Sequence, residues 1–296
     1  MNACISIISS RSRCLPQCLK SLWDFYNHQH DYPVYVYYFD DIYDSPSLQD
    51  AISHECPQKV IFRPIPYATP PFLKEEELFY NRDDLWYVRS GFGINRKGYL
   101  HMCHFMSNYF GYENTDFHQY DYTMSIDDES LFLKNLPYDP MSLLKQKKKM
   151  MGALRVYDQK VRTPHQGNYD TRVNLWTFIQ EYLKKFNVKP RSEFLKNLLK
   201  DPNSDHNFHF YPIADSYVVN LKLFQTPEWA QWIKAVNASG GIYKYRWGDN
   251  DINSWFYLIH YEDPIYDFRT VDEGYHNQGG LRHLQDIAPS IRNLDL

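Results

Sequence analysis

Hydrophobic positions in the first half of the chain alternate between continuous runs and helical stripes. Continuous apolar runs at residues 3–9 and 33–39 each predict a buried strand. Between them, leucine and aromatic residues recur at helical spacing and predict a helix over residues 15–27. A strand, a helix and a second strand in this order form a βαβ unit, which is right-handed by default. A third, short strand is expected at residues 60–62.

The second half of the chain continues with mixed elements. Thr226 followed by Pro227 predicts the start of a helix, which Gly240 and Gly241 end. Residues 242–247 are expected to form an aromatic and basic strand that leads into a turn. The other predicted elements are helices at residues 98–112, 140–150, 174–186, 192–199 and 252–260 and strands at residues 122–127, 151–157 and 213–219.

The stretch from Tyr122 to Phe132 is an apolar strand that ends in three acids, Asp127, Asp128 and Glu129. Open α/β sheets bind ligands at the carboxyl ends of their strands. Asp127 and Glu129 are two positions apart, so on an extended backbone both carboxylates point to the same side. Hard oxygen ligands suit Mg²⁺ or Mn²⁺, and such an ion can hold a diphosphate. From the triplet alone, a solvated acidic turn that closes the strand is the simpler interpretation.

These elements together predict an α/β fold. An alternating first half, an acid-rich strand end in the middle and a mixed second half are the layout of a GT-A-type nucleotide-sugar transferase, with a Rossmann-like first half and a central mixed sheet. We expect a single domain over residues 1–296. Residues 1–135 are expected to form its nucleotide-binding half and residues 136–296 its acceptor-binding half.

Composition excludes some classes of protein and favours others. The net charge of −4 gives no electrostatic reason to expect a nucleic-acid partner. The 26 tyrosines suit sugar ligands, because the ring stacks and the hydroxyl hydrogen-bonds, although core and sheet positions explain most of them. The five cysteines are odd in number and scattered, which indicates reduced thiols in an intracellular protein. No apolar run reaches the ~18 residues of a membrane span.

Three further patterns could carry chemistry. Arg11, just past the first strand, is placed to meet a phosphate or nucleotide, with exposure to solvent as the alternative. The glycines at residues 91–98 fail the spacing of a dinucleotide loop, because Arg96 occupies the place of the third glycine. His101 and His104 lie one helical turn apart, but no carboxylate has matching spacing, so packing or hydrogen-bonding roles are favoured over metal binding.

Four segments of the chain resemble motifs of one known family. Residues 98–105 (GYLHMCHF) resemble a SYRHMCRF helix, and residues 125–132 (SIDDESLF) occupy the place of a RVEPDVKF metal strand. Residues 240–249 (GGIYKYRWGD) resemble GGFYYERWGD and are the most specific match, and residues 268–276 (FRTVDEGYH) resemble a closing FRDIGYxH. In this order and spacing, the segments resemble those of the fungal α-1,2-mannosyltransferases of the Golgi, the Kre/Mnt/Ktr family.

The resemblance implies a retaining transfer of a sugar from a nucleotide donor, GDP-mannose in the family, to an oligosaccharide or glycoprotein acceptor, helped by Mn²⁺ or Mg²⁺. By position, Asp127 takes the place of the family's metal-binding Glu and Glu129 that of its Asp. Tyr99 takes the place of a tyrosine that lines the active site, and Arg11 that of an arginine after the first strand.

The sequence also departs from the family pattern. Asn253 stands where the family has a histidine that joins the metal, so His276 or Asp251 is a candidate substitute. The family's proposed nucleophile is a Glu; here Asp215 is the nearest acid, and Tyr217 is a candidate for the Glu's own position. These departures keep two alternatives open: a transferase that uses another nucleotide sugar and a catalytically decayed carbohydrate-binding relative. A metal-dependent sugar-phosphate hydrolase is a weaker rival, since it would need a denser set of His and Asp residues.

The predicted site has three parts. Its residues are Asp215, Tyr217 and Tyr99 for catalysis, Arg11, Tyr99, Asp127, Trp247 and Asp249 for donor binding, and Asp127, Glu129 and His276 for the metal. The first strand begins almost at Met1, without the family's membrane anchor and stem. We therefore expect a cytoplasmic or other soluble intracellular protein, such as a viral relative, or a Golgi-lumen protein if the chain is a trimmed form.

Overall fold

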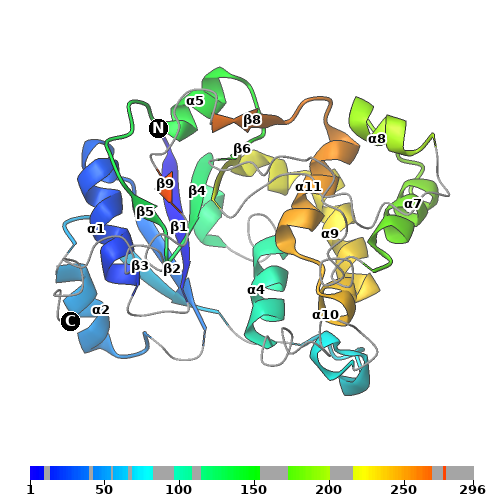
Figure 1. Cartoon of the computed structure of the whole chain (residues 1–296), viewed down its shortest axis with the longest axis horizontal. Coiled ribbons are helices and arrows are strands. Elements are labelled where there is room, and N and C mark those ends of the chain that lie inside the picture. Colours follow the sequence, from blue (N-terminus) through cyan, green and yellow to red (C-terminus); the bar gives the residue numbers. More distant parts are fainter. Residues whose placement is uncertain are drawn as a thin grey trace.

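The structure is a computed structural model. It describes residues 1–9, 14–39, 43–54, 56–65, 69–82, 97–108, 115–153, 173–200, 216–268 and 276–277, without the side chains of residues 97, 115, 276 and 277. Within these residues a seven-stranded mixed sheet runs through the middle of the molecule, in the order β3-β2-β1-β4-β7-β6-β8 (Figure 1). Its strands are β1 (Ala3–Ser9), β2 (Val34–Tyr38), β3 (Val60–Pro64), β4 (Tyr122–Asp127), β6 (Met151–Ala153), β7 (Tyr217–Asn220) and β8 (Ile265–Asp267).

The strand directions divide the sheet into two parts. Strands β1 to β4 are mutually parallel, so their carboxyl ends lie at one edge. Strand β7 runs antiparallel to both of its neighbours, and β8 is parallel to β6. A separate two-stranded sheet pairs β5 (Leu131–Phe132) with β9 (His276–Asn277). The βαβ start and the central mixed sheet confirm the predicted fold class.

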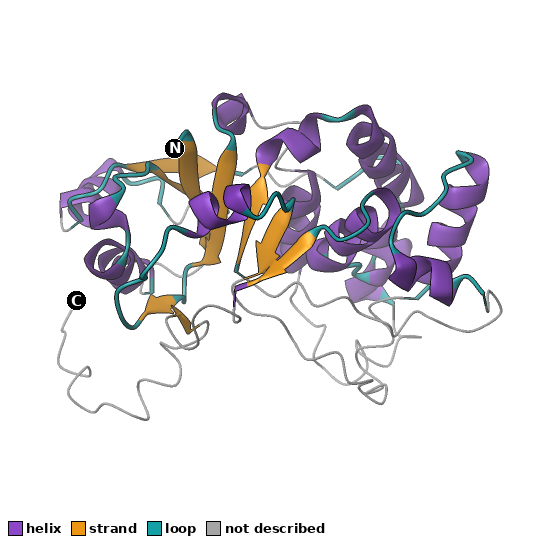
Figure 2. Ribbon diagram, turned by 90° about the horizontal axis from the view of Figure 1, so that it is seen from above, coloured by secondary structure: helices purple, strands orange, loops and turns teal. Residues whose placement is uncertain are grey.

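Helices lie on both sides of the sheet, as the view from above shows (Figure 2). The α-helices are α1 (Leu15–Phe25), α2 (Pro46–His54), α4 (Lys97–Asn108), α5 (Pro140–Gln146), α7 (Leu175–Lys185), α8 (Glu193–Leu198), α9 (Pro227–Ser239), α10 (Gly241–Tyr245) and α11 (Asp249–His260). The short 3₁₀ helices are η1 (Asn27–Gln29), η2 (Glu75–Glu77), η3 (Phe79–Asn81), η4 (Thr115–Gln119) and η6 (Leu221–Gln225). No helix in these described ranges is long and apolar enough to cross a membrane.

Two hydrophobic clusters, one on each side of the sheet, form the core. Because successive side chains of a strand point to opposite faces, each central strand supplies both clusters. Val34 and Val36 of β2 pack with α1 and α5, whereas Tyr35 and Tyr37 pack with the larger group of helices. That group comprises α4 and α7 to α11, and it covers one face of the sheet.

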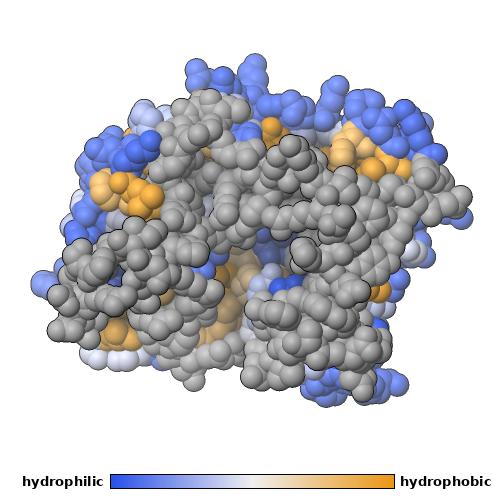
Figure 3. Space-filling model, in the orientation of Figure 1, coloured by the Kyte–Doolittle hydropathy of each residue, from blue (hydrophilic) through white to orange (hydrophobic). Residues whose placement is uncertain are grey.

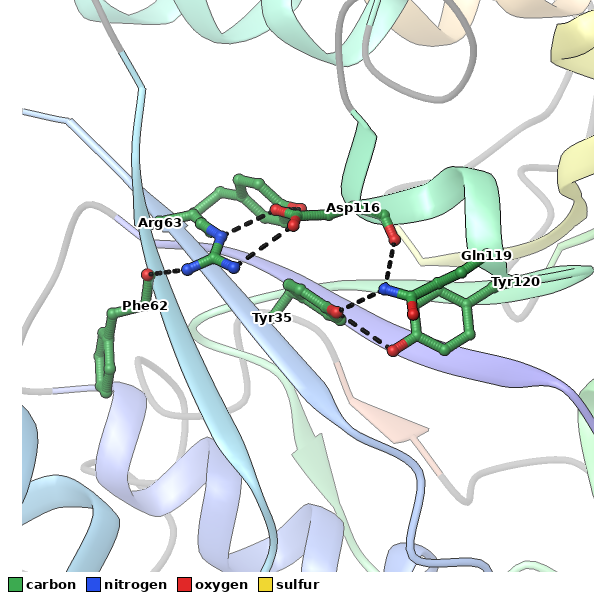
Figure 4. Close-up of polar contacts among 7 residues, drawn as sticks. Tyr35, Phe62, Arg63, Asp116, Gln119 and Tyr120 are labelled. Carbon is green, nitrogen blue, oxygen red and sulfur yellow. Dashed lines mark hydrogen bonds and ion pairs between the residues drawn. The ribbon is translucent and has the colours of Figure 1, made fainter.

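A polar network ties η4, which precedes β4, to strands β2 and β3 (Figure 4). Arg63 donates from Nε to Asp116 Oδ2 at 2.8 Å and from Nη2 to Asp116 Oδ1 at 3.3 Å. The hydroxyls of Tyr35 and Tyr120 lie 3.1 Å apart, and Gln119 donates to the Tyr35 hydroxyl at 3.4 Å. The paired Arg–carboxylate geometry fixes direction as well as distance, so the chain enters β4 at a defined place.

One predicted element is wrong. Residues 242–247 were expected to form a strand, but Gly241–Tyr245 forms helix α10. Gly240 ends α9 with a φ of 69°, a left-handed conformation that favours glycine, and a new helical turn begins at once. Its Ile242 and Tyr243 are buried in the larger cluster. The alternation of apolar and basic residues therefore reflects a single helical turn beside the core rather than a pleated strand.

Two further elements have no prediction. Helix α2 buries only Ile52, so it lacks the apolar stripe by which an amphipathic helix is found. Strand β8 has three residues, too few for alternation to show. The helix expected at 252–260 begins earlier, at Asp249, and the predicted helix at 98–112 is described to Asn108. All five cysteines lie in the described residues and none forms a disulfide.

The burial of His260, the last residue of α11, predicts a pH-dependent stability. Burial lowers the pKa of His260 to about 4, against an opposing effect of Glu228. In the unfolded chain the pKa of a histidine is about 6.5, so the unfolded chain binds this proton more readily between the two values. The stabilising contribution is complete above about pH 6.5 and is lost as the pH falls toward 4. Because the ring is partly exposed, we expect a loss of about 1–2 kcal/mol.

Urea unfolding of the wild type and of His260→Phe at pH 7.5 and pH 5 measures this contribution. Phenylalanine keeps a ring against Phe256, whose centroid lies 4.6 Å from that of His260, but it cannot be protonated. The variant is therefore expected to lose less stability than the wild type between the two pH values. Equal losses would show that other groups cause the acid sensitivity.

Candidate active site

The acidic stretch forms a turn at the carboxyl edge of the sheet. Strand β4 ends at Asp127, which pairs with Ile8 near the end of β1. The Ser130 backbone N–H donates to the Asp127 carbonyl at 3.0 Å and closes the turn. The expectation that an extended backbone points the Asp127 and Glu129 carboxylates to the same side is corrected here. The strand ends at Asp127, so Glu129 lies in the turn and strand alternation does not set its direction. The structure does leave Asp127 and Glu129 half-buried, with Asp128 between them buried.

Tyr217 lies opposite the carboxyl-terminal part of β4. It pairs in register with Ser125, on the face of the sheet that the larger group of helices covers. It is 2% exposed. Burial raises the pKa of Tyr217 well above its ordinary value, and the charges of Asp249 and Asp127 raise it further. The phenol is therefore protonated at neutral pH, which suits a hydrogen-bond donor rather than an attacking group.

Tyr99 of α4 brings a second tyrosine to the same group. The Arg246 guanidinium lies over its ring, 4.3 Å from the centroid, at a distance typical of a cation–π contact. Tyr99 and Asp249 both lie near the Cys103 thiol, close enough to influence its pKa. The interaction with Cys103 and burial raise the pKa of Tyr99 well above its ordinary value, so this phenol is also protonated. Helix α4 and the start of α11 thus meet around Tyr99, Arg246 and Asp249.

The segment from Arg246 to Asp249 is held in place by a glycine and a tryptophan. Arg246 has a φ of 57°, a left-handed conformation that is strained for a residue with a side chain. The Trp247 ring fills the space in which Gly241 lacks a side chain, and its Nε1 donates to the Val173 carbonyl at 2.9 Å. These contacts direct Arg246 towards Tyr99 and place Asp249 at the first position of α11.

The predicted site residues have different outcomes in the structure. Tyr99, Tyr217 and Asp249 are brought together, and Asp127 is near enough to influence the pKa of Tyr217. Trp247 is 2% exposed, so its ring packs in the core and supports the turn. Arg11 and Asp215 lie outside the described residues, as does the side chain of His276.

Sequence reasoning missed Arg246, although it lies in the most specific family-like segment. Its left-handed backbone and its contact with Tyr99 both depend on distant residues. The expectation for His101 and His104 agrees with the structure: both rings contact Tyr243, at centroid distances of 5.5 Å, and His101 Nδ1 lies 3.2 Å from its hydroxyl.

The acidic turn suits a divalent ion that arrives with a diphosphate. In the described part of the chain, no group of three or more His, Cys, Asp or Glu side chains could hold a metal by itself. Mg²⁺ commonly takes one or two carboxylates and completes its shell with phosphate oxygens and water. Two half-buried carboxylates, Asp127 and Glu129, fit that mode. The backbone of His276 pairs with Phe132, three residues beyond Glu129.

Asn253 offers a further oxygen within the site region. It lies on α11 one turn after Asp249 and is 2% exposed. Its Oδ1 has no hydrogen-bond partner among the residues that the structure describes. A buried acceptor without a partner carries a free-energy cost, so such a group is commonly completed by a ligand or an ordered water.

Apolar residues are visible near the middle of the face that Figure 3 shows. In the same orientation, they lie between the part of the molecule that carries β1 to β3 and the part that carries α4 (Figure 1). Open α/β sheets place their ligands beside the carboxyl edge of their parallel strands.

Comparison with solved structures identifies the fold. Core-mannan synthase A from Aspergillus fumigatus, in its Mn/GDP form, superposes with a TM-score of 0.70 and 15% identity over 91% of this chain and 73% of that chain. The mannosyltransferase Ktr4p from Saccharomyces cerevisiae, in complex with GDP, gives a TM-score of 0.69 and 21% identity over 90% of this chain and 68% of that chain. The predicted GT-A-type fold is confirmed.

Sequence comparison identifies the family. Probable mannosyltransferase YUR1 from Saccharomyces cerevisiae is 25% identical over 174 residues, which cover 53% of this chain and 38% of that protein. The aligned part is therefore less than half of that relative's length. The sequence model of the glycolipid 2-alpha-mannosyltransferase family matches residues 1–282, nearly the whole chain. The chain therefore belongs to the glycolipid 2-alpha-mannosyltransferase family.

Proposed function

We propose that this chain is a retaining mannosyltransferase that moves mannose from GDP-mannose to a glycan acceptor with the help of a divalent metal. The family match over residues 1–282 carries the proposal. The GDP found with both solved relatives, and the Mn of one of them, support the choice of nucleotide and metal. In this proposal residues 1–135 bind the nucleotide and residues 136–296 bind the acceptor.

The proposed roles follow from the charges that develop in the reaction. Cleavage of the bond between sugar and phosphate leaves negative charge on the diphosphate and positive charge on the sugar. Asp127 and Glu129, with His276 as a third candidate, would hold Mn²⁺ or Mg²⁺, which supplies a Lewis acid for the leaving diphosphate. Arg246, whose guanidinium lies over Tyr99, adds a fixed positive charge on the side of α4.

The remaining groups are proposed to bind the donor or to act on its sugar. Tyr99 and Tyr217 are held protonated, so each can donate a hydrogen bond to a sugar or phosphate oxygen. Asp249 can accept from a sugar hydroxyl, since its carboxylate lies at the start of α11, where the helix dipole stabilises negative charge. Arg11 is proposed to contact the nucleotide, and Asp215 to attack or stabilise the positive sugar carbon.

Thermal unfolding with a panel of nucleotide sugars tests this function. A ligand that binds only the folded chain raises the melting temperature by mass action. We expect GDP-mannose with Mn²⁺ at about 100 times its Kd to raise it by roughly 5 °C. UDP-glucose with Mn²⁺ and GDP-mannose with EDTA serve as controls and are expected to give much smaller shifts.

The pattern of shifts distinguishes the alternatives. A shift that needs Mn²⁺ but a different nucleotide sugar would correct the donor. A shift with GDP-mannose but no transfer to mannose-containing acceptors would indicate the decayed, carbohydrate-binding alternative. No shift with any donor would contradict the proposed function.

A further inference from the structure

The middle acid of the triplet differs from its neighbours. Asp128 is 2% exposed, whereas Asp127 and Glu129 are half-buried. Its Oδ2 accepts a hydrogen bond from Ser9 Oγ at 3.0 Å, and Ser9 Oγ lies 2.7 Å from the Tyr43 hydroxyl. Ser9 has a single hydroxyl proton, which it gives to the carboxylate, so Tyr43 donates to Ser9. Burial raises the pKa of Tyr43, which keeps its phenol protonated for this purpose.

This chain of hydrogen bonds joins three segments at the carboxyl edge of the sheet. Ser9 is the last residue of β1, Tyr43 follows β2, and Asp128 lies in the turn after β4. Tyr43 is itself fixed by its ring, whose centroid lies 5.4 Å from that of Phe62. The carboxylate of Asp128 is therefore bound to groups that the parallel sheet already holds in place.

Helix α1 holds both ends of the same turn. Cys18 Sγ donates to the Asp127 carbonyl at 3.6 Å, and Ser21 Oγ accepts from the Phe132 backbone N–H at 3.2 Å. The turn is thus fixed at its beginning, at its middle and just beyond its end. A loop with such anchors loses little conformational entropy when it binds a ligand, which is the effect of preorganisation.

We propose that Asp128 is a positioning residue. The Ser9–Tyr43–Asp128 network holds the turn, before any ligand binds, in the conformation in which Asp127 and Glu129 bind the metal and its diphosphate. The inference rests on the proposed function. It gives Asp128 a role in metal binding without a contact to the metal or the diphosphate. If so, removal of the Tyr43 hydroxyl, which does not touch the turn directly, weakens metal binding by Asp127 and Glu129.

Binding of Mn²⁺ in the presence of GDP, measured from the electron paramagnetic resonance signal of free Mn²⁺, tests the proposal. Tyr43→Phe keeps the ring and every charge but removes the donor to Ser9. We expect it to raise the Kd for Mn²⁺ about tenfold. Asp128→Asn is expected to raise it further, because a charge is lost as well. In the double variant, the effect of Tyr43→Phe should be less than about threefold, because the two residues act in one network.

Tyr35→Phe is the matched control. Tyr35 lies on β2, the strand that precedes Tyr43, and is also buried. The variant loses a comparable hydroxyl contact, with Tyr120 (Figure 4), but Tyr35 packs on the other face of the sheet. The Kd of this variant for Mn²⁺ should change by less than about twofold. Wild-type affinity in both Tyr43→Phe and Asp128→Asn would overturn this inference alone. A wild type that binds no Mn²⁺ with GDP would overturn the proposed function and this inference with it.

Discussion

Replacement of Asp127 by asparagine is expected to reduce the proposed mannosyl transfer by roughly 10²–10³-fold, the effect of removing one group that stabilises charge in a transition state. Asp127 ends β4 at the carboxyl edge, is half-buried, and lies near enough to Tyr217 to influence the pKa of that residue. Asparagine has nearly the same shape, so the strand end and turn can keep their backbone hydrogen bonds. The free energy of unfolding is expected to change by less than about 1 kcal/mol.

Asp121→Asn provides the control for this experiment. Asp121 directly precedes β4 at its opposite end and forms an exposed ion pair with Lys222 at 3.0 Å. The substitution is chemically identical, but it lies away from the carboxyl edge, so transfer should stay within about twofold of the wild type. Transfer is measured from GDP-mannose at saturating Mn²⁺, and folding from urea unfolding. Full activity in Asp127→Asn would remove Asp127 from the metal site.

The sheet and the acidic turn could be predicted from the sequence because their signals are local. A continuous apolar run marks β1 and another marks β2, and the acids at 127–129 follow directly on an apolar strand. The carboxyl edge of a parallel sheet then follows from topology alone. Nothing in this inference depends on a residue far away in the chain.

The contacts inside the site could not be predicted in the same way. Arg246 reaches Tyr99 only because α10 and α4 pack together, and no local pattern marks residues 147 positions apart in the chain. The three acids of the turn are equivalent in the sequence. The structure buries Asp128 beneath the other two because Ser9 lies next to it at the end of β1. Long-range packing therefore decides that Asp128 anchors the turn and that Asp127 and Glu129 stay half-buried at its surface.

The misassigned helix α10 shows the same effect. In the sequence, Gly240 and Gly241 together resemble a signal that ends a helix, and the aromatic and basic residues after them resemble a strand. The actual constraint on Gly241 is steric: a Cβ there would lie 2.2 Å from Cε3 and Cζ3 of Trp247. That requirement comes from a ring six positions later, so it appears only once the chain has folded back on itself.

Gly241→Ala is therefore expected to have the largest effect on stability of the glycine substitutions in residues 240–249. In a helix, alanine is normally favoured over glycine by up to about 1 kcal/mol. Here the Trp247 ring cannot move away freely, because it packs against Phe178 at a centroid distance of 5.2 Å and its Nε1 is hydrogen-bonded to Val173. Overpacking of this kind costs about 1–3 kcal/mol, occasionally more, and we expect a net loss near the upper end of that range.

The loss should extend to the site, because Trp247 directs Arg246 and Asp249 on either side of it. Binding of GDP-mannose with Mn²⁺ is expected to weaken together with stability, as measured by titration calorimetry and urea unfolding. Gly248→Ala is the control: among the described residues its Cβ would meet only Asp251 Oδ2, at an ordinary 3.5 Å. The free energy of unfolding should therefore fall by less than about 1 kcal/mol.

A second substitution shows whether the clash is the cause. Trp247→Phe removes part of the ring that the new methyl group of Gly241→Ala would meet. Gly241→Ala should therefore cost less in that background than in the wild type, a non-additivity typical of residues in contact. If Gly241→Ala costs the same in both backgrounds, the clash with Trp247 is not what makes glycine necessary. If it costs nothing in either, the close packing of α10 against the turn does not hold Arg246 and Asp249 in place.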